Sequence, residues 1–282
     1  MRVLLFGASG QLGKHVVNSL CSYSLISPSR HDLDIRYFYN VKNFFKITKP
    51  DVVINLAAFT NVELAENNRK DAYIINSLFP KVIAELCKNT NIPLIHISTD
   101  YVFDGNKKTK YYDDDIPNPL NYYGNTKFLG EKYIQEINDF YIILRTSWLY
   151  SFYGNNFLVK VLDKIKKKEQ IYVVNDQFGS PTSAKFVSNV ILQILGKLDK
   201  GKTGIYHSVS SGSCSWYEFS KKIADLTSEI DSINLIKPIK TENYPSIVKR
   251  PKSVVLDNTK LINTFMIESV HWADDLENLV KS

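Results

Sequence analysis

The chain has 282 residues, of which 44% are hydrophobic and 23% are charged, as in an ordinary globular protein. This length suits one large domain, or one domain with a smaller lobe. No apolar stretch approaches the roughly 20 residues that cross a bilayer, and the N-terminal apolar run is too short for a signal peptide. The three cysteines are far apart and lack metal-ligand spacing, so we expect reduced thiols in a cytoplasmic protein with no membrane partner.

The net charge of +6 is not distributed as in a nucleic-acid-binding protein. The densest basic run, residues 164–168, is typical of the solvated end of a helix that starts near Asn156, and no basic stripe with interleaved aromatic residues occurs. A modest positive balance suits phosphorylated small-molecule ligands instead. The acidic run at residues 113–115 indicates a solvated loop, so we expect no metal site.

Short apolar runs alternate with amphipathic stretches in the first half of the chain. This is the pattern of a parallel sheet with helical crossovers, and continuous apolar runs are typical of strands covered on both faces. The expected strands are at residues 3–6, 51–56, 94–97 and 141–144, and the expected helical faces are at residues 12–20 and 78–86. We therefore predict a doubly wound α/β fold.

A glycine-rich turn joins the first strand to the first helix. Its sequence, GASGQLG, contains Gly7, Gly10 and Gly13. Glycines here permit a tight turn, a close approach of backbone to a pyrophosphate, and close packing of helix on strand. The helix N-terminus adds free N–H groups and the positive end of its dipole. We therefore predict a Rossmann-like dinucleotide site, which also includes Gln11 and Leu12.

The end of the second strand favours NADPH over NADH. An NAD site usually carries an acidic residue about 20 residues after the turn, but Ser29 and Arg30 occupy this region. A hydroxyl beside a guanidinium suits a 2′-phosphate, although NADH stays open as the cofactor. Asp34 and Ile35 follow and could border the adenine.

Small residues follow the strand at residues 51–56. Ala57, Ala58 and Thr60 leave room for the ribose and nicotinamide of a cofactor. Tight core packing is an equally good explanation for the two alanines.

Tyr123, Lys127 and Thr99 are the candidate catalytic residues. Tyr123 and Lys127 are spaced to share one face of a helix, where the ammonium can favour the phenolate. A tyrosine tuned in this way can hand a proton to a carbonyl oxygen near neutral pH. Thr99 follows a buried strand and opens into the cleft where open α/β sheets bind ligands. Its hydroxyl can hold the carbonyl, and the structural alternative is a turn or helix cap.

The alternation loosens after about Trp148, where aromatic, glycine and loop residues become frequent. We predict a dinucleotide-binding domain at residues 1–148, with elements that return to its sheet near residues 171–196. Residues 149–170 and 197–282 are assigned mostly to a smaller C-terminal substrate-binding lobe.

Four sequence blocks carry a resemblance to a known family: GASGQLG at 7–13, NLAAFTNVELAE at 55–66, STDYVFDG at 98–105 and YYGNTKFLGE at 122–131. Weaker blocks are RTSWLY at 145–150, NDQFGSPT at 175–182 and RPKSVVLDNTKL at 250–261. With these blocks the chain resembles the extended short-chain dehydrogenases, and among them the dTDP-4-dehydrorhamnose reductases. STDYVFDG with AAFTNVELAE is specific, since related sugar-nucleotide epimerases usually carry a different sequence after the catalytic strand.

The resemblance implies a role for each catalytic candidate. Tyr123 is then the proton donor, Lys127 its partner on the nicotinamide ribose, and Thr99 the hydroxyl that positions the carbonyl. It also implies a substrate pocket that includes Thr60, Val62, Asp100, Tyr101 and Trp148.

Two residues keep a second explanation. Without the resemblance, Trp148 is more simply a core residue. Arg250 either reaches the substrate diphosphate through a bidentate contact or is a surface residue before Pro251.

The implied activity is the NADPH-dependent reduction of the 4-keto group of dTDP-4-dehydro-β-L-rhamnose to dTDP-β-L-rhamnose, with a homodimer left open. One alternative is a reductase or epimerase of another nucleotide sugar. The other is a non-enzymatic regulatory subunit, as in a relative of this family that binds methionine adenosyltransferase.

Overall fold

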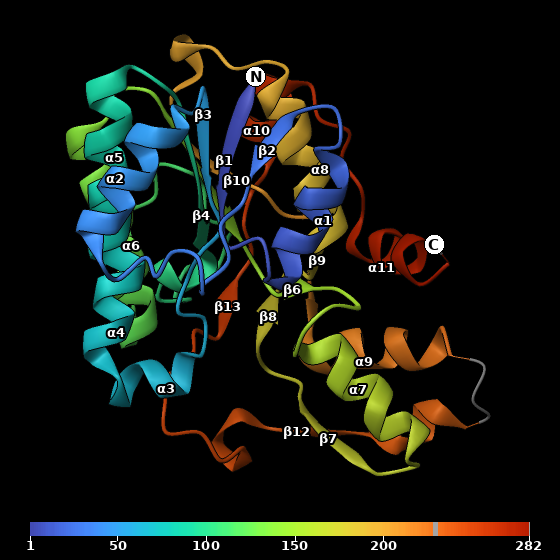
Figure 1. Ribbon diagram of the computed structural model, residues 1–282. Coiled ribbons are helices and arrows are strands. Elements are labelled where there is room, and N and C mark those ends of the chain that lie inside the picture. Colours follow the sequence, from blue (N-terminus) through green and yellow to red (C-terminus); the bar gives the residue numbers. More distant parts are fainter. Residues whose placement is uncertain (228–230, 282) are drawn as a thin grey trace.

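A six-stranded parallel sheet forms the centre of the computed structural model, which describes residues 1–227 and 231–281 (Figure 1). The strand order is β10-β5-β4-β3-β1-β2. The strands are β1 (Arg2–Phe6), β2 (Ser24–Ile26), β3 (Val52–Asn55), β4 (Leu94–Thr99), β5 (Tyr141–Thr146) and β10 (Gly204–His207). The four strands expected from the sequence are confirmed as β1, β3, β4 and β5.

Helices cover both faces of this sheet, as a doubly wound fold requires (Figure 1). One face packs against α2 (Phe38–Thr48), α5 (Phe79–Thr90) and α6 (Tyr122–Ile137), and the other against α1 (Gln11–Ser19), α8 (Ala184–Leu195) and α10 (Thr259–Phe265). Two short helices, α3 (Val62–Asn67) and α4 (Arg69–Tyr73), precede α5. The central strands are apolar throughout because both of their faces are buried in this way.

A smaller lobe packs around its own apolar cluster. It contains α7 (Phe157–Lys166), β7 (Ile171–Val174), α9 (Trp216–Asp225), β12 (Ile236–Ile239) and α11 (Trp272–Val280), and β7 pairs with β12 in parallel. The Asn156 side chain caps α7 by accepting from the amide of Val159. The predicted start of this helix is therefore confirmed.

Three elements lie in a different part of the structure from the one that the predicted domain boundaries assign them to. β7 lies in the lobe rather than in the large sheet, whereas β10 and α10 from the last third of the chain belong to the large sheet and its core. Strand β10 is short and begins at Gly204, so its sequence carries no strand pattern. Its pairing with β5 places it at the sheet edge.

Short strands join the two parts. β8 (Phe178–Gly179) pairs with β11 (Cys214–Ser215) and with β13 (Ser253–Val254), and β6 (Leu149–Tyr150) pairs with β9 (Thr182–Ser183). Three distant chain segments thus meet at β8. No helix in the described part of the chain is long and apolar enough to span a membrane.

Candidate active site

The glycine turn lies where the strand order reverses, at the carboxyl ends of β1 and β3. Gly7 has φ +87°, and a Cβ there would lie 2.7 Å from the amide nitrogen of Ala57. A Cβ on Gly13 would lie 2.2 Å from the carbonyl oxygen of Gly7. Both glycines are therefore required by backbone approach: Gly7 lets the turn touch the end of β3, and Gly13 lets α1 touch the turn.

This turn suits an anionic ligand. Gly10 is exposed at the N-cap of α1, and the first turn of that helix carries no acidic residue. The N-terminus of α1 therefore offers free N–H groups and the positive end of the helix dipole to an anion. Buried hydroxyls of Ser98 and Thr146, at the carboxyl ends of β4 and β5, have no hydrogen-bond partner among the described residues. A dinucleotide along this edge could supply one.

The loop after β2 leaves the sheet at the same edge, because β2 is parallel to β1. Ser29 and Asp32 exchange hydrogen bonds in an exposed turn that also presents Arg30. Asp34 instead pairs with Arg36 at 2.7 Å, which holds the pKa of its carboxyl below its ordinary value. Ile35 packs against the apolar cluster of α2 and α5.

The structure brings Thr99 and Tyr123 together. Thr99 ends β4, and its hydroxyl donates to the Asp100 carboxylate at 3.0 Å while accepting from the amide of Tyr101 at 3.2 Å. The capping explanation is thus correct for Thr99, but the same hydroxyl also interacts with the phenol of Tyr123. Asn121 caps α6 through the amide of Gly124 and so fixes the first turn that carries Tyr123.

One sequence expectation is contradicted. Burial raises the pKa of Tyr123, with the Asp100 carboxylate acting in the same direction and the Thr99 hydrogen bond opposing. The tyrosine is therefore held as a neutral phenol, rather than tuned toward the phenolate by Lys127. The reason is local: the amine of Lys127 points to the sheet, where it donates to the carbonyl of Ile97 at 2.6 Å.

Lys127 is itself perturbed. Burial lowers its pKa to about 8, and the Glu131 carboxylate acts in the opposite direction. Its amine nitrogen also lies 3.3 Å from Nε2 of His96, a fully buried residue of β4. His96 carried no signal in the sequence because its partners lie on a neighbouring strand and on α6.

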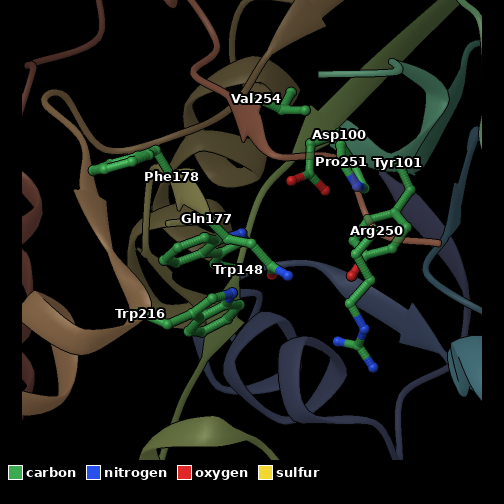
Figure 2. A pocket seen from close by; sticks show the side chains of 9 residues that line it. All are labelled: Asp100, Tyr101, Trp148, Gln177, Phe178, Trp216, Arg250, Pro251 and Val254. Atoms are coloured by element: carbon green, nitrogen blue, oxygen red, sulfur yellow. The ribbon is translucent and has the colours of Figure 1, made fainter. Parts of the chain in front are cut away.

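A pocket opens beside Asp100 and Tyr101, the two residues that follow Thr99 (Figure 2). Four residues that the sequence predicted to bind the substrate, Asp100, Tyr101, Trp148 and Arg250, line this pocket. Sequence reasoning missed the remaining lining residues, which are Gln177, Phe178, Trp216, Pro251 and Val254. Of these, Gln177 and Phe178 lie in the weaker block NDQFGSPT, which was the available signal.

Two stacked indoles form one wall of this pocket (Figure 2). Trp148 has φ +46° and stacks on Trp216 with ring centroids 3.5 Å apart and planes 6° from parallel. A Cβ on Gly179 would lie 2.5 Å from the Trp148 ring, so only glycine fits behind it. Trp148 is therefore a wall of the pocket, and the core explanation is wrong.

Arg250 lies across the pocket from the indole pair (Figure 2). Its guanidinium contacts Glu63 at 3.2 Å, and its positive charge opposes the burial that raises the pKa of Tyr101. The Nε of Arg250 is buried with no partner among the described residues. The surface explanation for Arg250 is therefore wrong, because its side chain is part of the pocket lining.

Asp100 is buried beneath the pocket. Its carboxylate accepts from the hydroxyls of Thr99 and Ser147, yet burial still raises its pKa to about 6.

Val62 packs in a cluster with Tyr101 and Tyr123. Thr60 is exposed just before α3, and Ala57 and Ala58 are half-buried. Among residues 1–227 and 231–281, no group of three or more His, Cys, Asp or Glu side chains has a metal-binding arrangement.

Comparison with known proteins settles the family. The family model described as RmlD substrate binding domain matches residues 1–282. A dTDP-4-dehydrorhamnose reductase of Aggregatibacter actinomycetemcomitans is 37% identical over 99% of this chain and 98% of its own. The chain belongs to the dTDP-4-dehydrorhamnose reductase family. The resemblance given by the four sequence blocks is confirmed.

Solved structures agree with this family assignment. A dTDP-4-dehydrorhamnose reductase from Clostridium acetobutylicum has a TM-score of 0.93 and 37% identity, covering 100% of this chain and 99% of its own. One from Bacillus anthracis, crystallised in complex with NADP, has a TM-score of 0.93 and 35% identity over the same shares. The predictions of an oxidoreductase and of an NADP-type cofactor are confirmed for this family of reductases.

Proposed function

We propose that this member of the family reduces the 4-keto group of dTDP-4-dehydro-β-L-rhamnose, with NADPH as the hydride donor and dTDP-β-L-rhamnose as the product. The observation that carries the proposal is the grouping of Thr99 and Tyr123 around Tyr101, a residue that lines the pocket: the Tyr101 amide donates to the Thr99 hydroxyl, and the Tyr101 and Tyr123 rings pack edge to face at 5.6 Å. The names of the family members support the substrate, and the NADP-bound relative supports the cofactor.

The cofactor would be held by the edge of the sheet. Gly7, Gly10 and Gly13 with Gln11 and Leu12 would receive the pyrophosphate, and Ser29 and Arg30 the 2′-phosphate. Ala57, Ala58 and Thr60 would border the ribose and nicotinamide, to which Lys127 would bind. NADPH when bound supplies the hydride. The residues of this chain must then orient the ketone and provide its proton.

Thr99 and Tyr123 would act on the carbonyl oxygen. As hydride reaches the carbon, negative charge develops on that oxygen, and two hydroxyl donors would stabilise it there more than in the ground state. Thr99 would do so by turning its one proton from the Asp100 carboxylate to the substrate oxygen. Tyr123 would then transfer its proton to the alkoxide. A raised pKa suits this role, because the phenol stays protonated until a stronger base than water appears.

The rest of the pocket would hold the nucleotide sugar. Arg250 offers a guanidinium for a bidentate contact with the diphosphate, and its pairing with Glu63 at 3.2 Å keeps it extended toward the pocket. The Trp148–Trp216 stack supplies an apolar wall that excludes water from the reacting carbonyl. The smaller lobe contributes Trp216 and would therefore take part in substrate binding.

The compartment is also a proposal. Cys21, Cys87 and Cys214 are all free in the structure. Free thiols are typical of a reducing compartment, so we propose that the reaction takes place in the cytoplasm.

A panel of nucleotide sugars tests the function. NADPH and NADH oxidation would be followed at fixed enzyme concentration with 4-keto-6-deoxy sugars linked to dTDP, UDP or GDP, and with the matching 4-hydroxy sugars. We expect oxidation of NADPH with the dTDP-linked 4-keto sugar. Turnover of a 4-hydroxy epimer without net oxidation would show an epimerase. Absence of turnover with every sugar, together with co-purification of a synthetase, would favour a regulatory subunit.

A further inference from the structure

A buried chain of polar side chains runs from the end of β3 to the catalytic helix. Asn55 and His96 are paired directly across β3 and β4. The side-chain amide nitrogen of Asn55 lies 3.0 Å from Nδ1 of His96, and Nε2 of His96 lies 3.3 Å from the amine of Lys127. Asn55 and His96 are 0% exposed and Lys127 is 2% exposed, so water does not compete for these contacts.

The backbone determines which way the Asn55 amide points. Its oxygen accepts from the amide of Ala57 at 3.1 Å. If the side-chain amide were flipped, its NH₂ group would face the N–H of Ala57, and both groups are donors. The NH₂ group of Asn55 therefore faces His96 and donates to Nδ1.

This orientation determines the tautomer of His96. A neutral imidazole carries one proton, and a nitrogen that accepts a hydrogen bond cannot also hold it. Burial and the positive charge of Lys127 both lower the pKa of His96, so the ring stays neutral. With Nδ1 as the acceptor, the proton is on Nε2, and this N–H faces Lys127.

An N–H donor next to Lys127 favours the neutral amine of this residue over the ammonium. The ammonium has three N–H groups and no lone pair, so it cannot accept from Nε2–H. The neutral amine can accept from His96 while it donates to the carbonyl of Ile97 at 2.6 Å. The nearby Glu131 carboxylate favours the ammonium of Lys127, but Glu131 is itself paired with Arg145 through contacts of 3.0 and 2.7 Å.

We propose that Asn55 and His96 are positioning residues for Lys127: Asn55 fixes His96 as the Nε2–H tautomer, and His96 donates to the amine and favours its neutral form. The inference rests on the proposed function only for the part that Lys127 plays in the reaction. Asn55 and His96 do not conduct protons to Lys127, because the Asn55 amide has no proton to release at neutral pH.

The tautomer can be measured directly. ¹⁵N NMR of the ligand-free full-length protein, labelled in histidine and with His96 identified through His96→Gln, distinguishes a protonated from an unprotonated ring nitrogen. We expect Nε2–H with a bare Nδ1 between pH 7 and 8. A proton on Nδ1, or on both nitrogens, would overturn the proposal. Because no ligand is present, this result is independent of which sugar the enzyme reduces.

A substitution tests the effect on Lys127. Asn55→Asp replaces the donor at Nδ1 with an acceptor, which moves the proton to Nδ1 and leaves Nε2 to accept from the ammonium. We expect the titration midpoint of Lys127, followed by ¹³C NMR of ε-labelled lysine and identified through Lys127→Met, to rise by at least about one pH unit, a tenfold change in its protonation equilibrium.

Two controls distinguish an effect of the His96 tautomer on the Lys127 midpoint from an effect of the added charge and from the loss of a buried histidine. In a His96→Leu background, Asn55→Asp should move the Lys127 midpoint by less than half as much, and an equal shift would show that charge alone acts. His207→Leu removes another histidine that is 0% exposed, whose Nδ1 contacts the carbonyl of Asp257, and should leave the Lys127 midpoint unchanged. If Asn55→Asp does not fold, the wild-type tautomer still decides the proposal.

Discussion

Replacing Gly179 with alanine should displace the Trp148 indole and weaken substrate binding. The new Cβ would lie 2.5 Å from Cε2 of Trp148, whereas ordinary contacts begin at 3.4 Å, so the ring must move by about 1 Å. It cannot move away freely, because Trp216 is stacked on its other face at 3.5 Å. Either the stack opens or β8 shifts, and both change the wall of the pocket.

The magnitude follows from these contacts. Overpacking a filled site costs about 1–3 kcal/mol of folding free energy. Loss of an aromatic pair costs about 0.5–1.5 kcal/mol. If the second loss appears in binding, the KM for the nucleotide sugar rises about 2- to 12-fold, since 1.4 kcal/mol is a factor of ten. The KM for NADPH should change less, because the added Cβ meets only atoms of the Trp148 ring.

Near-UV circular dichroism reports the coupled indoles, and steady-state kinetics report the two KM values. Gly196→Ala is the matched control, because a Cβ there would lie 3.7 Å from the carbonyl oxygen of Gln193, an ordinary contact. It should leave both readouts unchanged. A Gly179→Ala enzyme with the wild-type indole signal and wild-type KM would refute the placement of Trp148 as a substrate wall.

The remaining predictions concern the pocket residues. Tyr123→Phe should lower kcat by about 10²- to 10⁴-fold with NADPH affinity retained, and wild-type turnover would contradict its role as the acid. Arg250→Ala should raise the KM for the nucleotide sugar about 10- to 100-fold, from a charged hydrogen bond of about 1.5–3 kcal/mol, whereas the control Arg2→Ala, at an exposed arginine paired with Asp51 at the start of β1, should leave it unchanged. Asp100 has a pKa raised from 3.8 to about 6 by burial, so its stabilising contribution is present at low pH and is lost as pH rises through about 6. Asp100→Asn should therefore remove up to about 3 kcal/mol of the pH dependence of unfolding between pH 4 and 7, at about 1.36 kcal/mol per pKa unit. Urea denaturation at several pH values measures this, and an unchanged pH dependence would contradict it.

Features set by local backbone constraints could be predicted from the sequence. Gly7 and Gly13 are required within a single strand–turn–helix unit, so their spacing indicates the site directly. Thr99 ends β4, and Asp100 and Tyr101 follow it without a break and line the pocket. The central strands could also be predicted from the sequence, because burial on both faces requires a continuous apolar run.

Features that depend on distant segments could not be predicted. The stack of Trp148 on Trp216 exists because β8, β11 and β13 bring three segments together, and no spacing in the chain records that pairing. The direction of the Lys127 amine depends on His96, and that of His96 on the register of β3 against β4. The helical spacing of Tyr123 and Lys127 therefore supplied the catalytic candidates but the wrong direction for the pKa of Tyr123.

Deuteride transfer tests the central claim most directly. The enzyme would be incubated with the dTDP-linked 4-keto-6-deoxy sugar and NADPH deuterated at the transferable position of C4 of the nicotinamide, and the product analysed by NMR. The proposed reaction predicts one deuterium at C4 of the sugar for each NADPH consumed, and loss of this product with Tyr123→Phe. A 4-hydroxy product without deuterium at C4, or no product while NADPH remains intact, would contradict it.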